Sequence, residues 1–168
     1  MSEWIEGRNA VLEAFRSGRT VDRVYLLEGC QDGPLHTIAR EARKKDTIVT
    51  YVPRERLDQL SKTKAHQGVL AQVASYDYAS VEDILERAKE KGEPPFLILL
   101  DNVEDPHNLG AVIRTANLAG AHGVIIPKRR SVGLTATVAK TSAGAITYTP
   151  GAKVANLVRR MEEPKKEG

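Results

Sequence analysis

The segment Leu100–Pro127 constrains the fold of this chain more than any other part of the sequence, because it joins two apolar strands through a polar turn and an amphipathic helix. The strand that leads into it, Phe96–Leu100, is entirely apolar, which is typical of a parallel sheet covered on both faces. We expect the helix over Leu109–Ala119 and the second strand over Gly123–Ile126. A parallel strand–helix–strand unit is right-handed and places its ligand site beyond the carboxyl ends of its strands.

The turn Asp101–Asn108 lies at that edge and is rich in polar side chains. Asn108 can cap the helix, and Arg114 follows it by about one and two-thirds turns, so both can approach one end of the helix. The guanidinium of an arginine is planar, permanently charged and matched to a phosphate. The alternatives are structural: a polar turn can satisfy its own backbone, and Arg114 can form an ion pair with Glu104 or Asp105.

A basic run, Lys128, Arg129 and Arg130, follows the second strand at the same edge of the sheet. It can hold the backbone of a nucleic acid, and a solvated basic loop is the equally weighted alternative. The formal net charge of the chain, +3, is compatible with a nucleic-acid partner without requiring one.

The chain is long enough for two small domains, and its composition divides it at a break around Gly92–Pro95. Before the break, residues 75–93 read as an acidic linker with helical character, in which Ser80 and Asp83 can form a capping box. The domains are therefore expected at 1–74 and 94–168. In the first we predict helices over Asn9–Phe15, Leu35–Lys45 and Arg54–Ser61, and strands over Val21–Leu27, Thr47–Val52 and Gly68–Ala74.

In the second domain, the elements after residue 127 carry weaker patterns. We predict a small-residue helix over Thr135–Ala145, a short strand over Ile146–Thr149 and a last helix over Lys153–Met161. The fold class is accordingly α/β in both domains.

Several kinds of site are excluded by the sequence. It contains no GxGxxG after a strand, no Walker-type phosphate loop, no HExxH and no cluster of Cys and His that could bind a metal. Cys30 is the only cysteine, so no internal disulfide is possible. The amino terminus does not resemble a signal peptide, and the longest apolar run is far too short to span a membrane, so we expect a cytoplasmic protein without membrane contacts.

Four stretches of sequence together resemble one known family. Asp105–Ser131, which reads DPHNLGAVIRTANLAGAHGVIIPKRRS, resembles motif 1 of the SpoU-type (TrmH-like) RNA ribose methyltransferases of the SPOUT superfamily, and Ala139–Ala145 (AKTSAGA) is similar to the helix that follows it. Trp4–Phe15 and Ala65–Val73 resemble the ribosomal-protein-L30e-like domain that precedes the methyltransferase domain. The resemblance is closest to the bacterial enzymes that 2′-O-methylate a guanosine of 23S ribosomal RNA.

The resemblance implies an enzyme that transfers a methyl group from S-adenosylmethionine to a ribose 2′-hydroxyl of ribosomal RNA. In the family, the arginine that matches Arg114 activates this hydroxyl with the help of the substrate phosphate, and the asparagine that matches Asn108 helps to hold the site. A hydroxyl is a weak nucleophile and needs a positioned base or a stabilised oxyanion. Because an arginine stays protonated, orientation and charge stabilisation are the roles we expect of Arg114.

The resemblance also implies RNA-facing residues in the first domain, namely Arg8, Asn9, His66 and Gln67. Taken alone, His66 is more typical of a residue that makes local hydrogen bonds. We expect Trp4 to be a packing anchor rather than a base-stacking surface.

The sequence departs from the family in its later part. The family's later motifs, a Gly/Glu-rich loop and a Ser-Leu-Asn segment, tie a trefoil knot, bind the methyl donor and build the homodimer interface, and this sequence contains neither. We therefore expect a chain truncated before these motifs, in effect the first half of a SPOUT-type domain without its knot, with unknown cofactor-binding residues and without the family's dimer contacts. The alternative is a catalytically incompetent RNA-binding module that lacks the methyl-donor site, and binding of the donor distinguishes the two.

Overall fold

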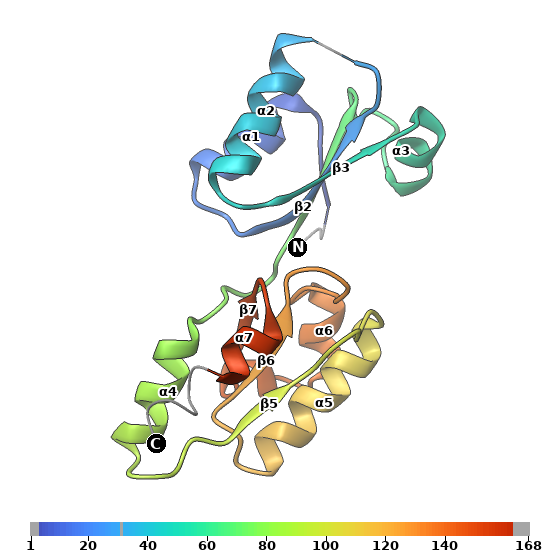
Figure 1. Ribbon diagram of the computed structural model, residues 1–168. Helices are drawn as coiled ribbons and strands as arrows, with labels where there is room; N and C mark the ends of the chain where they lie inside the picture. Colours follow the sequence, from blue (N-terminus) through green and yellow to red (C-terminus); the bar gives the residue numbers. More distant parts are fainter. Residues whose placement is uncertain (1–3, 31, 163–168) are drawn as a thin grey trace. The chain divides into compact units, whose positions relative to one another are not determined.

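The computed structural model describes residues 4–30 and 32–162, and the chain divides into two compact units, Met1–Ser75 and Tyr76–Gly168. Each unit has its own sheet and its own buried core (Figure 1). The expected α/β class is confirmed, with a mixed sheet in the first unit and a parallel sheet in the second.

The first unit is built on a four-stranded sheet in the order β1-β4-β2-β3. Strands β2 and β3 are parallel, whereas β4 pairs antiparallel with both β1 and β2. The elements are β1 (Trp4–Glu6), α1 (Arg8–Arg16), β2 (Val21–Leu27), α2 (Gly33–Lys44), β3 (Ile48–Val52), α3 (Arg54–Leu60) and β4 (Val69–Val73).

The alternation of side chains along a strand divides this unit into two cores. Val24 and Leu26 of β2 lie in one buried cluster with residues of α1 and α2 such as Phe15 and Ile38. The intervening Tyr25 lies in the other cluster, with Leu57 of α3 and Leu70 of β4 among its residues. Helices α1 and α2 therefore cover one face of the sheet and α3 the other. Trp4 packs in the second cluster with its ring centroid 5.6 Å from that of Tyr25, which agrees with the packing role expected of it.

The second unit is built on a three-stranded parallel sheet in the order β5-β6-β7. One face is covered by α5 and α6, whose Leu109, Ile113 and Val138 pack with Val124 and Ile126 of β6. The elements are α4 (Val81–Glu90), β5 (Leu97–Leu99), α5 (Pro106–Leu118), β6 (Gly123–Pro127), α6 (Ala136–Thr141), the 3₁₀ helix η1 (Ala145–Thr147), β7 (Gly151–Val154) and α7 (Leu157–Glu162).

The opposite face of this sheet is covered by α4, which lies in the segment interpreted from the sequence as a linker. Its predicted capping box forms: the Ser80 side chain accepts from the Asp83 N–H, and the Asp83 side chain accepts from the Ser80 N–H. Ile84 is fully buried and packs with Ile125 of β6. At Gly123 an added Cβ would lie 2.6 Å from Ile84, so this helix is part of the core of the second unit rather than a solvated connection.

The elements that follow β6 differ most from the prediction. Residues Ile146–Thr149, expected as a strand, contain the end of η1 and the exposed Tyr148. The strand lies instead at Gly151–Val154, where Val124 pairs with Gly151, so the expected helix over Lys153–Met161 is shortened to α7. The reason is local: α6 ends at Thr141, Ala143 and Gly144 beyond it both have positive φ, and the chain then needs the 3₁₀ turn before it can return to the sheet edge.

Candidate functional site

The loops that follow β5 and β6 are joined to each other at the carboxyl edge of the parallel sheet. The N–H of Val132 donates to the carbonyl of Val103 at 2.9 Å, and the Ser131 hydroxyl donates to the same carbonyl at 3.3 Å. Because Asp101–Asp105 and Lys128–Ser131 are held together in this way, the polar turn and the basic run share one edge, as the sequence predicted.

The cap of α5 is Asp105 and not Asn108. The Asp105 carboxylate accepts from the N–H of His107 at 2.7 Å and of Asn108 at 3.4 Å. Pro106 then occupies the first helical turn, where its missing N–H costs nothing, so the helix begins three residues before the expected start. The prediction that Asn108 caps the helix is therefore wrong, and its exposed side chain lies on the first turn of α5.

Arg114 is exposed on the third turn of α5. Among the residues that the structure describes, no ion pair or hydrogen bond involves its guanidinium, so the alternative of an ion pair with Glu104 or Asp105 is not formed. Asn108 and Arg114 are six positions apart, which separates them by about 120° around the axis and about 9 Å along it. The two side chains therefore do not share one face of the helix. A group that contacts both must lie beside the helix, between the two side chains.

Helix α5 is a rigid support for Arg114 because it packs on β6 and α6. Ile113, the neighbour of Arg114 in sequence, is fully buried. At Gly110, an added Cβ would lie 2.6 Å from the Cβ of Thr141, so the two helices approach as closely as backbones allow. The last three residues of α6, Ala139–Thr141, begin the AKTSAGA segment, and Thr141 also contacts His107 at 3.4 Å between Oγ1 and Nδ1.

The basic run after β6 is anchored by its first residue. The N–H of Lys128 donates to the carbonyl of Val154 at the end of β7, at 2.8 Å. Arg129 and Arg130 are exposed, and Arg130 has a left-handed backbone with φ of 58°. These cations lie on the loop after β6, which is hydrogen-bonded to the loop Asp101–Asp105 through the carbonyl of Val103.

In the first unit, Arg8 and Gln67 are joined by two hydrogen bonds. The backbone N–H of Arg8 donates to Oε1 of Gln67 at 3.1 Å, and its Nε donates to the carbonyl of Gln67 at 3.0 Å. The guanidinium of Arg8 also pairs with Asp32, the cap of α2. The hydrogen bond from the Leu35 N–H, together with the charge of Arg8, holds the pKa of Asp32 below its usual range despite some desolvation. Asn9, next in sequence to Arg8, is exposed.

His66, expected to face RNA, is an internal residue. It is 3% exposed, its Nδ1 accepts from the N–H of Gly68 at 3.0 Å, and its Nε2 lies 3.0 Å from Oδ1 of Asp58. Because Nδ1 is an acceptor, the ring proton is on Nε2 and is donated to Asp58. The imidazole therefore fixes the turn before β4, and we assign it no direct contact with RNA.

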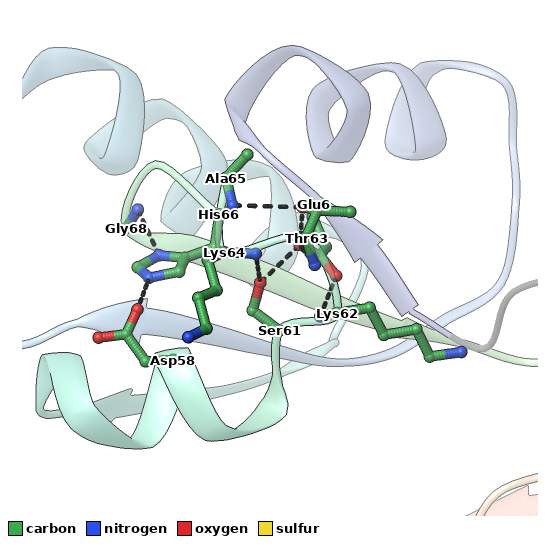
Figure 2. Close-up of polar contacts among 9 residues, drawn as sticks. All are labelled: Glu6, Asp58, Ser61, Lys62, Thr63, Lys64, Ala65, His66 and Gly68. Atoms are coloured by element: carbon green, nitrogen blue, oxygen red, sulfur yellow. Dashed lines mark hydrogen bonds and ion pairs between the residues drawn. The ribbon is translucent and has the colours of Figure 1, made fainter.

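A further polar cluster, which the sequence analysis did not find, surrounds Glu6 at the end of β1 (Figure 2). Its carboxylate accepts from the Ser61 hydroxyl at 2.6 Å, the Lys62 N–H at 2.7 Å, and the N–H and hydroxyl of Thr63 at 3.3 and 2.5 Å. Burial raises the pKa of Glu6, but the hydrogen bonds from Ser61, Thr63 and Lys62 outweigh it and lower the pKa to about 2. No local sequence pattern signals this contact, because its partners are 55 to 57 residues apart.

Two cavities, of about 470 and 210 Å³, are lined by described residues of the first unit. In the described part of the second unit, every buried polar side-chain atom has a hydrogen-bond partner. We assign no residue to the methyl donor.

Within residues 4–30 and 32–162, no group of His, Cys, Asp and Glu side chains is arranged to bind a metal ion. None of the helices described there has the length and apolar character needed to cross a membrane.

Comparison with known proteins gives a family match in each unit. Residues 4–79 match the family described as RNA 2′-O ribose methyltransferase substrate binding, and residues 95–168 match the SpoU rRNA methylase family. A protein of Bacillus subtilis, named as the TrmH family tRNA/rRNA methyltransferase YacO, is 48% identical over 99% of this chain and 66% of its own length. A TrmH family relative from Staphylococcus haemolyticus is 44% identical over 98% of this chain and 66% of its own length.

Among solved structures, the SpoU methyltransferase AviRb of Streptomyces viridochromogenes in complex with AdoMet is similar over 98% of this chain and 58% of that one, with 19% identity and a TM-score of 0.46. The chain spans about two thirds of the length of the curated relatives that it matches. The matches run over nearly all of this chain and do not by themselves support the expected truncation. Because the two family matches cover most of the sequence in order, the chain belongs to the SpoU family of RNA methylases.

Proposed function

We propose that this chain acts in the 2′-O-methylation of RNA ribose with S-adenosylmethionine as the methyl donor. The observation that carries the proposal is Arg114: an exposed guanidinium, without an ion pair among the described residues, on the third turn of a helix whose other face is buried. The segment that contains it matches the SpoU methylase family.

In this proposal, Arg114 acts on the hydroxyl side of the reaction. A ribose hydroxyl becomes nucleophilic as its proton leaves, and negative charge then develops on the oxygen. A guanidinium that donates to this oxygen and to the neighbouring phosphate orients the hydroxyl and stabilises the charge. A guanidinium stays protonated and cannot accept the proton itself, so the substrate phosphate or water takes that role.

Asn108 supports this site from the first turn of the same helix. Its exposed amide can donate to or accept from a ribose or phosphate group that lies between it and Arg114. Since the Asp105 carboxylate already caps the helix, the amide of Asn108 is not needed for that purpose.

RNA is the proposed substrate on both units. Arg8, Asn9 and Gln67 supply a polar surface in the unit that matches the family's substrate-binding description, and Lys128, Arg129 and Arg130 supply cations beside the loop of Asp105. We propose ribosomal RNA, specifically a guanosine of the 23S molecule, as the target, on the basis of the sequence resemblance. The names of the relatives mention both tRNA and rRNA, so tRNA is the competitor to test.

The test is transfer of a radioactive methyl group from S-adenosylmethionine to 23S ribosomal RNA and, in parallel, to bulk tRNA. Incorporation into 23S RNA that survives alkaline hydrolysis as a 2′-O-methyl dinucleotide supports the proposal, and incorporation only into tRNA changes the target. Calorimetric titration with the donor gives the second readout. If the chain shifts RNA in a gel but binds no donor and transfers no methyl group, it is an RNA-binding module and the enzymatic proposal is wrong.

A further inference from the structure

The segment Ser61–Gln67 connects α3 to β4 in the first unit and has an unusual backbone. Lys64 and Gln67 both adopt left-handed conformations, with φ of 57° and 52°. Such values are uncommon for residues other than glycine and persist only where surrounding contacts fix them. His66 and Arg8 hold the end of this segment, and Glu6, the last residue of β1, holds its first part.

Glu6 holds three successive residues of the segment at once. Its carboxylate accepts four hydrogen bonds from Ser61, Lys62 and Thr63. The side chains of Ser61 and Thr63 then accept hydrogen bonds from the two residues that follow. The Ser61 oxygen accepts from the Lys64 N–H at 2.8 Å, and the Thr63 oxygen accepts from the Ala65 N–H at 3.2 Å. Figure 2 shows the carboxylate at the centre of this network, which reaches every residue from Ser61 to Ala65.

The segment held by Glu6 carries two exposed lysines. Lys62 and Lys64 are exposed, and both are tied to the network through their backbone N–H groups. Among the ion pairs of the described residues, neither ammonium takes part. The network thus fixes the backbone below each lysine and leaves its charge available to a ligand.

The same segment ends at the polar surface of Arg8. Gln67 closes the segment and accepts from the Arg8 backbone, so the two lysines and this surface belong to one continuous stretch of the first unit. The cation pattern suits a polyanion whose charges are spaced along a backbone.

We propose that Glu6 is a positioning residue for RNA: it holds Ser61–Ala65 in the shape that presents Lys62 and Lys64 to backbone phosphates. This inference rests on the proposed function, because it takes RNA as the partner. Glu6 touches no RNA in this account and acts through the lysines.

We predict that the change in RNA affinity on replacement of Glu6 is opposite to the change expected from charge alone. Removal of a carboxylate from the neighbourhood of a bound polyanion ordinarily tightens binding, because a repulsive charge disappears. If Glu6 is a positioning residue, Glu6→Gln weakens binding instead, since its amide cannot accept all the donors that the carboxylate does.

The experiment measures fluorescence anisotropy of a fluorescein-labelled hairpin RNA with the full chain, in a series of KCl concentrations. Lys62→Ala and Lys64→Ala should each lower the magnitude of the slope of log K against log salt by about 1 and weaken binding by about fivefold at 0.1 M salt. Glu6→Gln should lower both the slope and the affinity, although it makes the protein more positive.

Lys45→Ala is the matched control, because it removes the same charge from another exposed position of the first unit. Lys45 precedes β3, whose Ile48 pairs with Arg23 near the start of β2. The segment Ser61–Gln67 precedes β4, whose Val69 pairs with Leu26 near the end of β2. The two lysine positions are therefore at opposite ends of the sheet, and Lys45→Ala should leave slope and affinity close to those of the wild type.

Thr63→Val provides a second route if Glu6→Gln fails to fold, as judged by circular dichroism. It removes one donor to Glu6 and keeps the carboxylate, and it should also weaken RNA binding. Binding by Glu6→Gln or Thr63→Val that equals or exceeds that of the wild type, in folded protein, overturns the positioning role while the proposed function stands. Failure of the wild type to bind the hairpin, 23S RNA or tRNA overturns both.

Discussion

Gly110 of α5 lies so close to Thr141 of α6 that a Cβ at position 110 would be 2.6 Å from the Thr141 Cβ and 3.0 Å from the backbone nitrogen of Ser142. This approach fixes the helix that carries Asn108 and Arg114 against α6, in which the AKTSAGA segment begins. The geometry of the candidate site therefore depends on a residue that has no side chain to contribute.

Replacement of Gly110 by alanine should destabilise the chain. Alanine favours a helix by about 1 kcal/mol over glycine, but overpacking against a backbone costs about 1–3 kcal/mol, so we expect a net loss in the free energy of unfolding by urea. Gly33→Ala is the control, because Gly33 lies in the first turn of α2 with nothing within 4 Å of an added Cβ. A Gly110→Ala variant at least as stable as the wild type would contradict the close approach.

Removal of the α5 cap should cost more than removal of the neighbouring amide. Asp105→Ala loses two hydrogen bonds to backbone N–H groups and should lower the free energy of unfolding by about 1 kcal/mol. Asn108→Ala removes an exposed side chain that caps nothing and should change stability by less than about 0.5 kcal/mol. Equal losses in the two variants, measured by thermal unfolding, would be evidence against the assignment of the cap.

The stability of the first unit should depend on the ionisation of Glu6. A carboxyl whose pKa falls from 4.5 to about 2 on folding stabilises the folded state above pH 4.5, and this contribution is lost as the pH falls toward 2. The difference in unfolding free energy between wild type and Glu6→Gln should therefore shrink between pH 5 and pH 2. Urea titrations at several pH values measure it, with Glu13→Gln, an exposed residue of α1, as the control. A difference independent of pH would contradict the ionised state.

Replacement of Arg114 should separate activity from folding and RNA binding. Because the side chain is exposed and unpaired among the described residues, Arg114→Ala should leave the midpoint of thermal unfolding within about 1–2 °C of the wild type. Arg114→Lys keeps the charge but loses the planar fork, so it should recover little methyl transfer. Full recovery by lysine would mean that charge alone suffices.

Much of the fold follows from local sequence patterns. Strand β2 occupies Val21–Leu27 as predicted, since the apolar Val24, Leu26 and Leu27 lie there between turn signals. The capping box of α4 is equally local, because Ser80 and Asp83 are three residues apart. The burial of that helix was missed, however, because the acidic residues of its exposed face dominate the composition of the segment.

Other features depend on contacts that no local pattern records. Strand β7 has one β-branched residue in four, and only its pairing with β6 makes it a strand. The three residues of β1 are likewise ordered by β4, far along the chain. At the site, the Asp–Pro pair that begins α5 was visible in the sequence, but Asn108 also had a capping residue's character, and the structure was needed to choose Asp105.

The most direct test of the central claim is transfer of the radioactive methyl group to 23S ribosomal RNA by the wild type and by Arg114→Ala, with RNA binding measured on the same preparations. We predict 2′-O-methylated product with the wild type, a loss of at least about 100-fold with Arg114→Ala, and an RNA affinity that falls by no more than about fivefold, the loss expected for one phosphate contact. Methyl transfer by Arg114→Ala at the wild-type rate would contradict it.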